Sequence, residues 1–341
     1  MKRLLQVLLC VLAVAVLAEA SDGLGALRPS TAKTHVLAGR LTVCVPETSQ
    51  SEAMQHGIMA APESDTEQTR VVIDAGPQRM VLMVYELYAR TGDLDAAAGK
   101  EAGRFPQKVN LQKWSLPAPL RAVAYFPAAP TKDHEANLVM GVFVAQADGS
   151  VQMLQWYVNP QGAEDQAGTL KLAQAIARTI APGDKSLDAG AGEREMAAGS
   201  QAKSVFITVP EGYVVSEQRG VDFLVHHVHK ITRFGEPSAS IGIYLGDHPS
   251  NDREGFVKSG TSSLFGKKAQ WYLKTAKENG ETVLIADALV PLAPSLFGYS
   301  LPGTGDGPSY ADVFLTAGDE ATLKELETIA ATVRIGNRKT R

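Results

Sequence analysis

The sequence predicts an α+β fold made of two repeated modules, each an antiparallel sheet closed by a C-terminal helix. Three observations favour this fold class: a helical pattern occurs twice, a hairpin pattern precedes each copy of it, and both copies open with a similar strand. Within each copy the strands come first and the helix last. That order fits antiparallel sheets better than the alternating strands and helices of a parallel sheet.

The last predicted helix, residues 322–336, is the best-defined element, and residues 169–183 repeat its pattern. Thr332 and Gly336 occupy the places that Thr179 and Gly183 have in the earlier copy. Both segments place apolar residues at helical spacing, which predicts one buried face on each helix. These faces are Leu323, Leu326, Ile329, Ala330 and Val333 in the later copy and Leu170, Ala173, Ile176, Ala177 and Ile180 in the earlier one.

A hairpin is predicted before each helix. In the first copy Asp148-Gly149 separates two apolar runs, and glycine supplies the positive φ that a tight turn needs. In the second copy a Gly-rich tip at residues 303–307 lies between two apolar runs. Asn279-Gly280 gives a further hairpin signal in the second copy.

The opening strands of the two copies are also alike. Residues 41–47 (LTVCVPE) match residues 205–211 (VFITVPE), and in each the proline ends the strand because it lacks a donor for the sheet. The copies lie 164 residues apart at these openings and 153 apart at the helices, so the first carries about 11 more residues. Loops tolerate a difference of that size.

These repeats divide the chain into a first module at residues 39–183, a linker at 184–203 and a second module at 204–336. The linker is rich in Gly, Ala and charge, lacks apolar periodicity and follows a helix-stopping Pro-Gly. A short helix is expected within residues 90–102, which are polar and rich in alanine.

The order of elements and the Val-Pro-Glu openings resemble those of the Mog1/PsbP-like modules. The resemblance covers about residues 40–182 and 203–336. It implies a compact antiparallel sheet with a packing helix at the C-terminus, and it identifies no functional residue. Such modules have non-catalytic and accessory roles.

The N-terminus has the pattern of a Sec-type signal peptide at residues 1–20. Lys2 and Arg3 precede an apolar run at residues 4–17, and small residues precede a cleavage site after Ala20. The alternative is a retained membrane anchor, although the run is short for a span and no second segment approaches that length. The sequence therefore predicts a periplasmic or secreted protein with no stable membrane span after cleavage.

The composition narrows the classes of partner. The chain has 341 residues, enough for two cores, and a formal net charge of −4 without a basic stripe, which argues against nucleic acid. Removal of the signal peptide leaves Cys44 as the single cysteine, so no internal disulfide is expected. Exported chains without disulfides, rich in Ala and Gly, suit a bacterial periplasm.

The histidines give the one candidate metal site. His227 and His229 lie two apart on a predicted strand, so both imidazoles project from the same face. Two such side chains can bind one metal if a third ligand joins them, and His248 supplies it only if the fold brings it near. The alternative is a half-buried strand whose outer end is polar.

The tryptophans give the candidate partner-binding residues. Trp156-Tyr157 and Trp271-Tyr272 place bulky side chains on both faces of their strands. One aromatic of each pair is expected in the core, and the other could anchor a partner. The alternative is a sheet face covered by the module's own helix.

No catalytic template fits the sequence, and no catalytic residue or cofactor is predicted. Residues 298–302 lack the closing glycine of a nucleophile elbow, and Ser-x-x-Lys spacings occur only at residues 30–33, before the first module, and at residues 200–203, in the linker. The main hypothesis is an exported, non-enzymatic binding protein whose partner is a protein of the cell envelope. The alternatives are a periplasmic immunity protein that inhibits a toxin and a metal-assisted hydrolase that uses the strand from His226 to His229.

Overall fold

The computed structural model describes residues 23–55, 58–59, 68–103, 105, 108–128, 137–197, 203–219, 223–249, 253–278, 281–293 and 309–337. The predicted signal peptide and the Gly-rich tip at residues 303–307 lie outside these residues. Among the described helices, none combines the length and the apolar character that a membrane crossing requires.

The prediction of an α+β fold with a closing helix per module is wrong. The structure is 54% strand and 17% helix, and most of its core residues lie on four sheets with antiparallel neighbours. The observed helix covers only part of the predicted residues 322–336, because α5 (Glu320–Ala330) is followed by β22 (Arg334–Asn337). Likewise α4 (Gln166–Ala177) leads into β11 (Ala181–Pro182), so in both modules a strand follows the helix.

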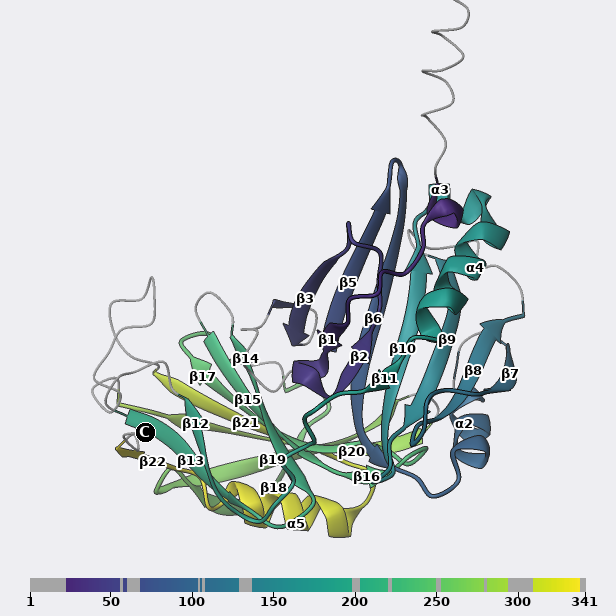
Figure 1. Ribbon diagram of the computed structural model, residues 1–341. Helices are drawn as coiled ribbons and strands as arrows, with labels where there is room; N and C mark the ends of the chain where they lie inside the picture. Colours follow the sequence, from purple (N-terminus) through teal and green to yellow (C-terminus); the bar gives the residue numbers. More distant parts are fainter. Residues whose placement is uncertain are drawn as a thin grey trace, which may run out of the picture.

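The first module consists of a large sheet and a three-stranded sheet (Figure 1). The large sheet has the order β4 (Ile58–Met59), β3 (Gln50–Gln55), β5 (Gln68–Ala75), β6 (Gln78–Arg90), β10 (Ser150–Val158), β9 (Asn137–Ala145), β8 (Arg121–Pro127) and β7 (Val109–Trp114). The small sheet has the order β1 (Thr34–Val36), β2 (Leu41–Val43) and β11. The remaining elements are η1 (Leu24–Ala26), η2 (Leu37–Gly39), α2 (Leu94–Ala102) and α3 (Pro160–Glu164).

The second module has the same two kinds of sheet. Its large sheet has the order β14 (Tyr213–Arg219), β15 (Phe223–Lys230), β17 (Ala239–Gly246), β21 (Tyr310–Ala317), β20 (Glu281–Pro291), β19 (Lys267–Glu278) and β18 (Val257–Leu264). Its small sheet has the order β12 (Gly192–Ala197), β13 (Lys203–Val209) and β22. Residues 192–197 of the expected linker therefore form a strand of the second module.

The strand order is the same in both modules. Seven strands of the first large sheet, from β3 across to β7, correspond to the seven of the second, from β14 across to β18. Counted along the chain, the strands in each set lie side by side in the order first, second, third, seventh, sixth, fifth and fourth. The small sheets agree in register as well. Ala181 pairs with Thr42 and Arg334 pairs with Phe206, and these pairs are related by the same 153- and 164-residue offsets as the sequence repeat.

Thr179 and Thr332 show the repeat at atomic detail. The Thr179 hydroxyl donates to the carbonyl of Ile176 at 2.6 Å and accepts from the N–H of Cys44 at 2.8 Å. The Thr332 hydroxyl donates to the carbonyl of Ile329 at 2.7 Å and accepts from the N–H of Thr208 at 2.9 Å. Each threonine thus satisfies a carbonyl at the helix end and ties the helix to the opening strand.

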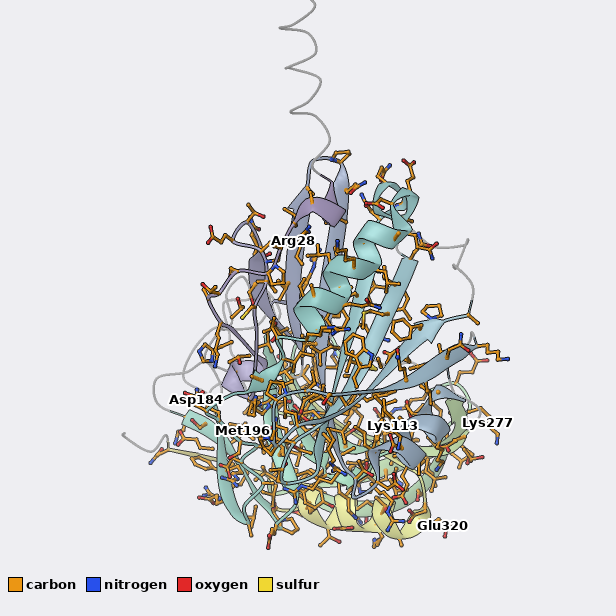
Figure 2. The ribbon with its side chains drawn as sticks, turned by 45° about the vertical axis from the view of Figure 1, so that its right-hand side comes forward. Arg28, Lys113, Asp184, Met196, Lys277 and Glu320 are labelled. Atoms are coloured by element: carbon orange, nitrogen blue, oxygen red, sulfur yellow. The ribbon has the colours of Figure 1, made fainter. Side chains whose placement is uncertain are left out.

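Each large sheet has one face covered by its module's helix and small sheet. In the first module Leu172 and Ile176 of α4 and Leu41 of β2 share a core with Leu82 and Leu154. The second core is built in the same way, from α5, β13 and the large sheet. Figure 1 shows α4 and α5 on the outer sides of their sheets, and Figure 2 places Arg28 and Glu320 at opposite ends of the molecule.

The predicted Asp148-Gly149 turn and the short helix are confirmed. Asp148-Gly149 connects β9 to β10, with Gly149 at φ +83°. β19 and β20 pair as a hairpin from Glu278 and Glu281 outward, while Asn279-Gly280 themselves lie outside the described residues. α2 falls within residues 90–102, where the carboxylate of Asp93 caps it.

Candidate functional site

A segment of the second module crosses to the first and joins its sheet. Residues 231–237, which we call the strap, contain β16 (Thr232–Arg233), and β16 pairs in parallel with the end of β6. Thr232 lies opposite Ala89 and Arg233 opposite Arg90. The N–H of Phe234 then donates to the carbonyl of Arg90 at 2.8 Å. Main-chain pairing therefore continues from one module into the other.

Phe234 anchors the strap in the first module. Its side chain is 5% exposed and lies in a cluster with Leu94 and Ala98 of α2, and its ring centroid is 5.1 Å from that of Phe143. This cluster covers the end of the first large sheet on the face opposite α4. Full burial of a phenylalanine contributes roughly 1.5–3 kcal/mol, so one side chain makes a substantial part of the junction. Gly235, at φ +87°, lets the strap turn directly after it.

A stacked ring pair forms a second contact between the modules. The ring of Tyr88 lies 4.0 Å from the ring of His229, with 2° between their planes. Tyr88 has φ +47° and lies at a bulge in β6. Glu86 pairs with Gln152 of β10 and Ala89 pairs with Val151, so two residues of β6, one of them Tyr88, are left without a partner on β10. The bulge re-aims Tyr88 toward the second module.

A buried polar network supports the bulge from within the first module. The Arg40 guanidinium donates to the carboxylate of Glu86 at 3.1 Å, and the Gln152 amide donates to the same carboxylate at 3.1 Å. Burial raises the pKa of Glu86, while the charge of Arg40 and the hydrogen bond from Gln152 act against that rise. Loss of one partner would leave a buried charge uncompensated, so the network fixes this end of β6.

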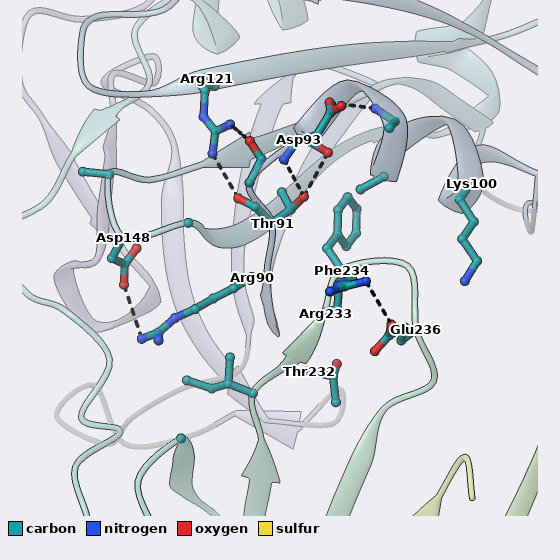
Figure 3. Close-up of a pocket in the computed structure, with 17 residues that line it drawn as sticks. Arg90, Thr91, Asp93, Lys100, Arg121, Asp148, Thr232, Arg233, Phe234 and Glu236 are labelled. Carbon is teal, nitrogen blue, oxygen red and sulfur yellow. Dashed lines mark hydrogen bonds and ion pairs between the residues drawn. The ribbon is translucent and has the colours of Figure 1, made fainter.

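A pocket of about 1060 Å³ opens beside the strap (Figure 3). Both modules line it, the first with the end of β6, one side of α2, the start of β8 and the β9–β10 turn, the second with Gly212 and the strap. We call it the junction pocket. Its size is that of a site for a small ligand or for several side chains of a partner. Its charged residues are Arg90, Asp93, Lys100, Arg121, Asp148, Arg233 and Glu236.

Two of these charged residues have structural roles. The Arg121 guanidinium donates to the carbonyls of Gly92 at 2.7 Å and Thr91 at 3.1 Å, which fixes the turn after β6. The Asp93 carboxylate accepts from the N–H of Ala96 at 3.1 Å and caps α2.

The two ion pairs of the pocket are loose, although the Asp148 carboxylate itself accepts hydrogen bonds from the N–H of Ser150 at 3.0 Å and from the Ser150 hydroxyl at 2.7 Å. Arg90 and Asp148 are 3.8 Å apart, and Arg233 and Glu236 are 4.0 Å apart, both beyond ordinary hydrogen-bond length. These side chains are 46% to 79% exposed. Ion pairs of this kind are worth about 0–1 kcal/mol, so they exchange readily for other partners.

The candidate metal ligands are not brought together. His227 and His229 share one face of β15, with ring centroids 5.7 Å apart, as their spacing predicts. His248 follows β17 beyond Gly246, which pairs with Phe223 at the opposite end of β15. Within the described part of the chain, no group of three or more His, Cys, Asp or Glu side chains could hold a metal. The neighbour of His229 is Tyr88, which gives this histidine a place in the junction.

The candidate partner anchors are core residues. Trp156 is 0% exposed and Trp271 is 1% exposed, so neither reaches a partner surface. The Trp271 indole donates to the hydroxyl of Ser262 at 2.8 Å. For both tryptophans, therefore, the alternative stated from the sequence is correct: each lies on a covered face of its sheet.

Sequence reasoning missed the strap. The alternation that places His227 and His229 on one strand does not reveal that β15 ends at Lys230. The signal available was Phe234-Gly235-Glu236-Pro237, a large aromatic residue directly before a turn sequence. A lone phenylalanine at that place indicates burial, but not that another module buries it.

Comparison with known proteins gives no family. No protein-family model matches the chain, so the resemblance to Mog1/PsbP-like modules stays a prediction. No curated protein matches it either.

Three solved structures align over most of the chain. The apo immunity protein TplEi of the T6SS from Pseudomonas aeruginosa is 11% identical, with 89% of this chain and 96% of that chain covered and a TM-score of 0.22. The Tle4–Tli4 complex is also 11% identical, with 88% and 96% covered and a TM-score of 0.21. TplEi complexed with the "L" peptide is 10% identical, with 89% and 96% covered and a TM-score of 0.21. Superpositions at such TM-scores establish neither a shared fold nor a shared function.

Proposed function

We propose that this protein binds another protein at the junction of its two modules, without catalysing a reaction, and that the partner is a toxin that it inhibits. The observation that carries the proposal is the strap. It joins the second module to the first through main-chain pairing and the buried Phe234, and so presents surfaces of both modules in one fixed arrangement.

A fixed arrangement suits an inhibitor because association is opposed by every group that must be ordered on binding. A preformed junction avoids part of that cost. The junction pocket, lined by both modules, lies where one partner can contact both. The charged groups of the junction pocket cap α2, brace the turn after β6 or form loose ion pairs, an arrangement that supplies contacts for a partner protein.

The proposed place of action is the periplasm. The Sec-type pattern at residues 1–20 supports export, and a mature chain that begins at Ser21 is expected. N-terminal sequencing of the protein from a periplasmic extract tests this. A chain that retains residues 1–20 would show an anchor instead.

Site-specific photo-cross-linking tests the protein-binding function. A photoreactive residue replaces Glu236 in the full exported chain, and a second chain carries it at Lys324, an exposed residue on α5. The proposal predicts one protein cross-linked from position 236 and not from position 324. That protein, expressed alone in the same compartment, should slow growth, and co-expression of this chain should restore it.

Two outcomes would overturn the proposal at different levels. Equal cross-linking from both positions would show that the junction is not the binding site. A specific partner whose expression is harmless would leave protein binding in place and remove the toxin from the proposal.

A further inference from the structure

The junction pocket carries more positive than negative charge, in a chain whose formal net charge is −4. Four cationic side chains face three carboxylates. Arg121 is held by neutral carbonyls, so its charge has no counter-ion in that contact. Among the described residues, none forms an ion pair or hydrogen bond with the Lys100 ammonium, and Figure 3 shows this side chain extended beside the strap.

The carboxylates of the pocket balance this charge only in part. Asp93 is occupied by the N–H of Ala96 at the start of α2. Asp148 and Glu236 stand 3.8 and 4.0 Å from Arg90 and Arg233, too far for firm hydrogen bonds. A carboxylate from outside can therefore approach Arg90, Arg233 and Lys100 without breaking a strong internal pair.

We infer that the junction pocket binds an acidic segment of the partner protein, whose Asp or Glu carboxylates pair with Arg90, Lys100 and Arg233. The inference rests on the proposed protein-binding function. Arginine recognises carboxylates through two parallel N–H donors, and the two arginines come from different modules, so one acidic segment contacts both.

The geometry favours a peptide over a single phosphate ion. A phosphate is usually held by free N–H groups at a helix N-terminus, and here Asp93 occupies that position and repels an anion. The cations are also spread around a pocket of about 1060 Å³, which one phosphate leaves mostly empty.

Fluorescence anisotropy of labelled hexaglutamate with the full-length protein tests the inference, with labelled hexalysine and inorganic phosphate as comparisons. Hexaglutamate should bind, more weakly as salt rises, and hexalysine should not. The double variant Arg90→Glu/Arg233→Glu should weaken hexaglutamate binding about tenfold or more. Lys268→Glu/Lys324→Glu changes the net charge equally at exposed residues that do not line the pocket and should leave the dissociation constant within about twofold.

Equal loss in both double variants, or no loss in either, would overturn the inference. So would displacement of hexaglutamate by equimolar phosphate, because the site would then be one for small anions. Lys100→Gln, an exposed change on α2, serves as a milder variant if the double variant fails to fold, and it should weaken hexaglutamate binding measurably.

The acidic-segment inference and the proposed binding function can be tested separately. If a captured partner binds the Arg90→Glu/Arg233→Glu variant as tightly as the unchanged protein, the acidic-segment inference is wrong while the binding function holds. If hexaglutamate binds as expected but no partner cross-links at position 236, the binding function is wrong.

Discussion

The ring of His229 in the second module lies flat against the ring of Tyr88 in the first, with 4.0 Å between centroids and 2° between planes. The hydroxyl of Ser216 and a ring nitrogen of His229 are 3.4 Å apart, and this contact further limits the rotation of the His229 ring. Together with the strap, this stack makes the junction a packed interface instead of a loose link. The predictions below follow from that junction and from the repeat.

Phe234→Ala should destabilise the protein by about 3–5 kcal/mol, the usual cost of removing a buried phenylalanine. The loss arises because the cavity lies among Phe143, Leu94 and Ala98, which cannot all move inward. Urea unfolding measures it. Phe234→Leu keeps most of the volume and should cost less than half as much. A change below about 1 kcal/mol for the alanine variant would show that the strap is not anchored.

The Tyr88–His229 stack should show a coupling of about 0.5–1.5 kcal/mol in a double-mutant cycle of Tyr88→Leu and His229→Leu. The coupling measures the ring contact separately from what each side chain does alone. Chemical unfolding of the four proteins at one pH provides the values. Strictly additive effects would mean that the rings do not interact in solution.

Thr179→Val and Thr332→Val remove the same two hydrogen bonds from the two modules. Thr179 is the more buried of the two, so its variant leaves the N–H of Cys44 poorly solvated and should cost about 1–3 kcal/mol. The variant at Thr332, where water can replace the hydroxyl, should cost about 0.5–1.5 kcal/mol. A larger loss of stability in the Thr332 variant than in the Thr179 variant would contradict the view that burial sets the difference between these two sites.

Asp312 should make stability fall as pH rises. Burial, and next the nearby charge of Asp287, raise the pKa of Asp312 to about 8, against the opposing charge of Arg253. The folded state then holds a proton that the unfolded state releases near pH 4, so this contribution is complete below pH 4 and disappears as pH rises through 8.

Unfolding free energies measured between pH 4 and 8 should therefore decline in the unchanged protein, and Asp312→Asn should flatten the decline. Carbon NMR of the Asp312 carboxyl group should show its titration near pH 8. A midpoint near 4 would show that the carboxyl group is solvated in solution.

The sequence was sufficient for the repeat and for one of its local turns. The apolar spacing around Ile176 and Ile329 and the Asp148-Gly149 turn reflect interactions between residues close in the chain. The fold class was wrong because the helical spacing does not reveal that Ala181 and Arg334 leave the helix and pair with strands far back in the chain.

The candidate site could not be predicted for a similar reason. Trp156 and Trp271 were ambiguous because alternation places one aromatic of each pair in the core without saying which. The partners of Phe234 and His229 lie in the other module, and no local pattern encodes a contact between residues so distant in sequence.

The central claim is that the strap holds the two modules in one arrangement. The most direct test is the distance distribution between spin labels at Lys171→Cys on α4 and Lys324→Cys on α5, in a Cys44→Ser background. Pulsed electron–electron double resonance measures this distribution in the protein with Phe234 intact and in the Phe234→Ala variant. A single narrow distribution that broadens in the Phe234→Ala variant is the predicted result. A broad distribution in the protein with Phe234 intact would contradict the claim, since the modules would then move independently.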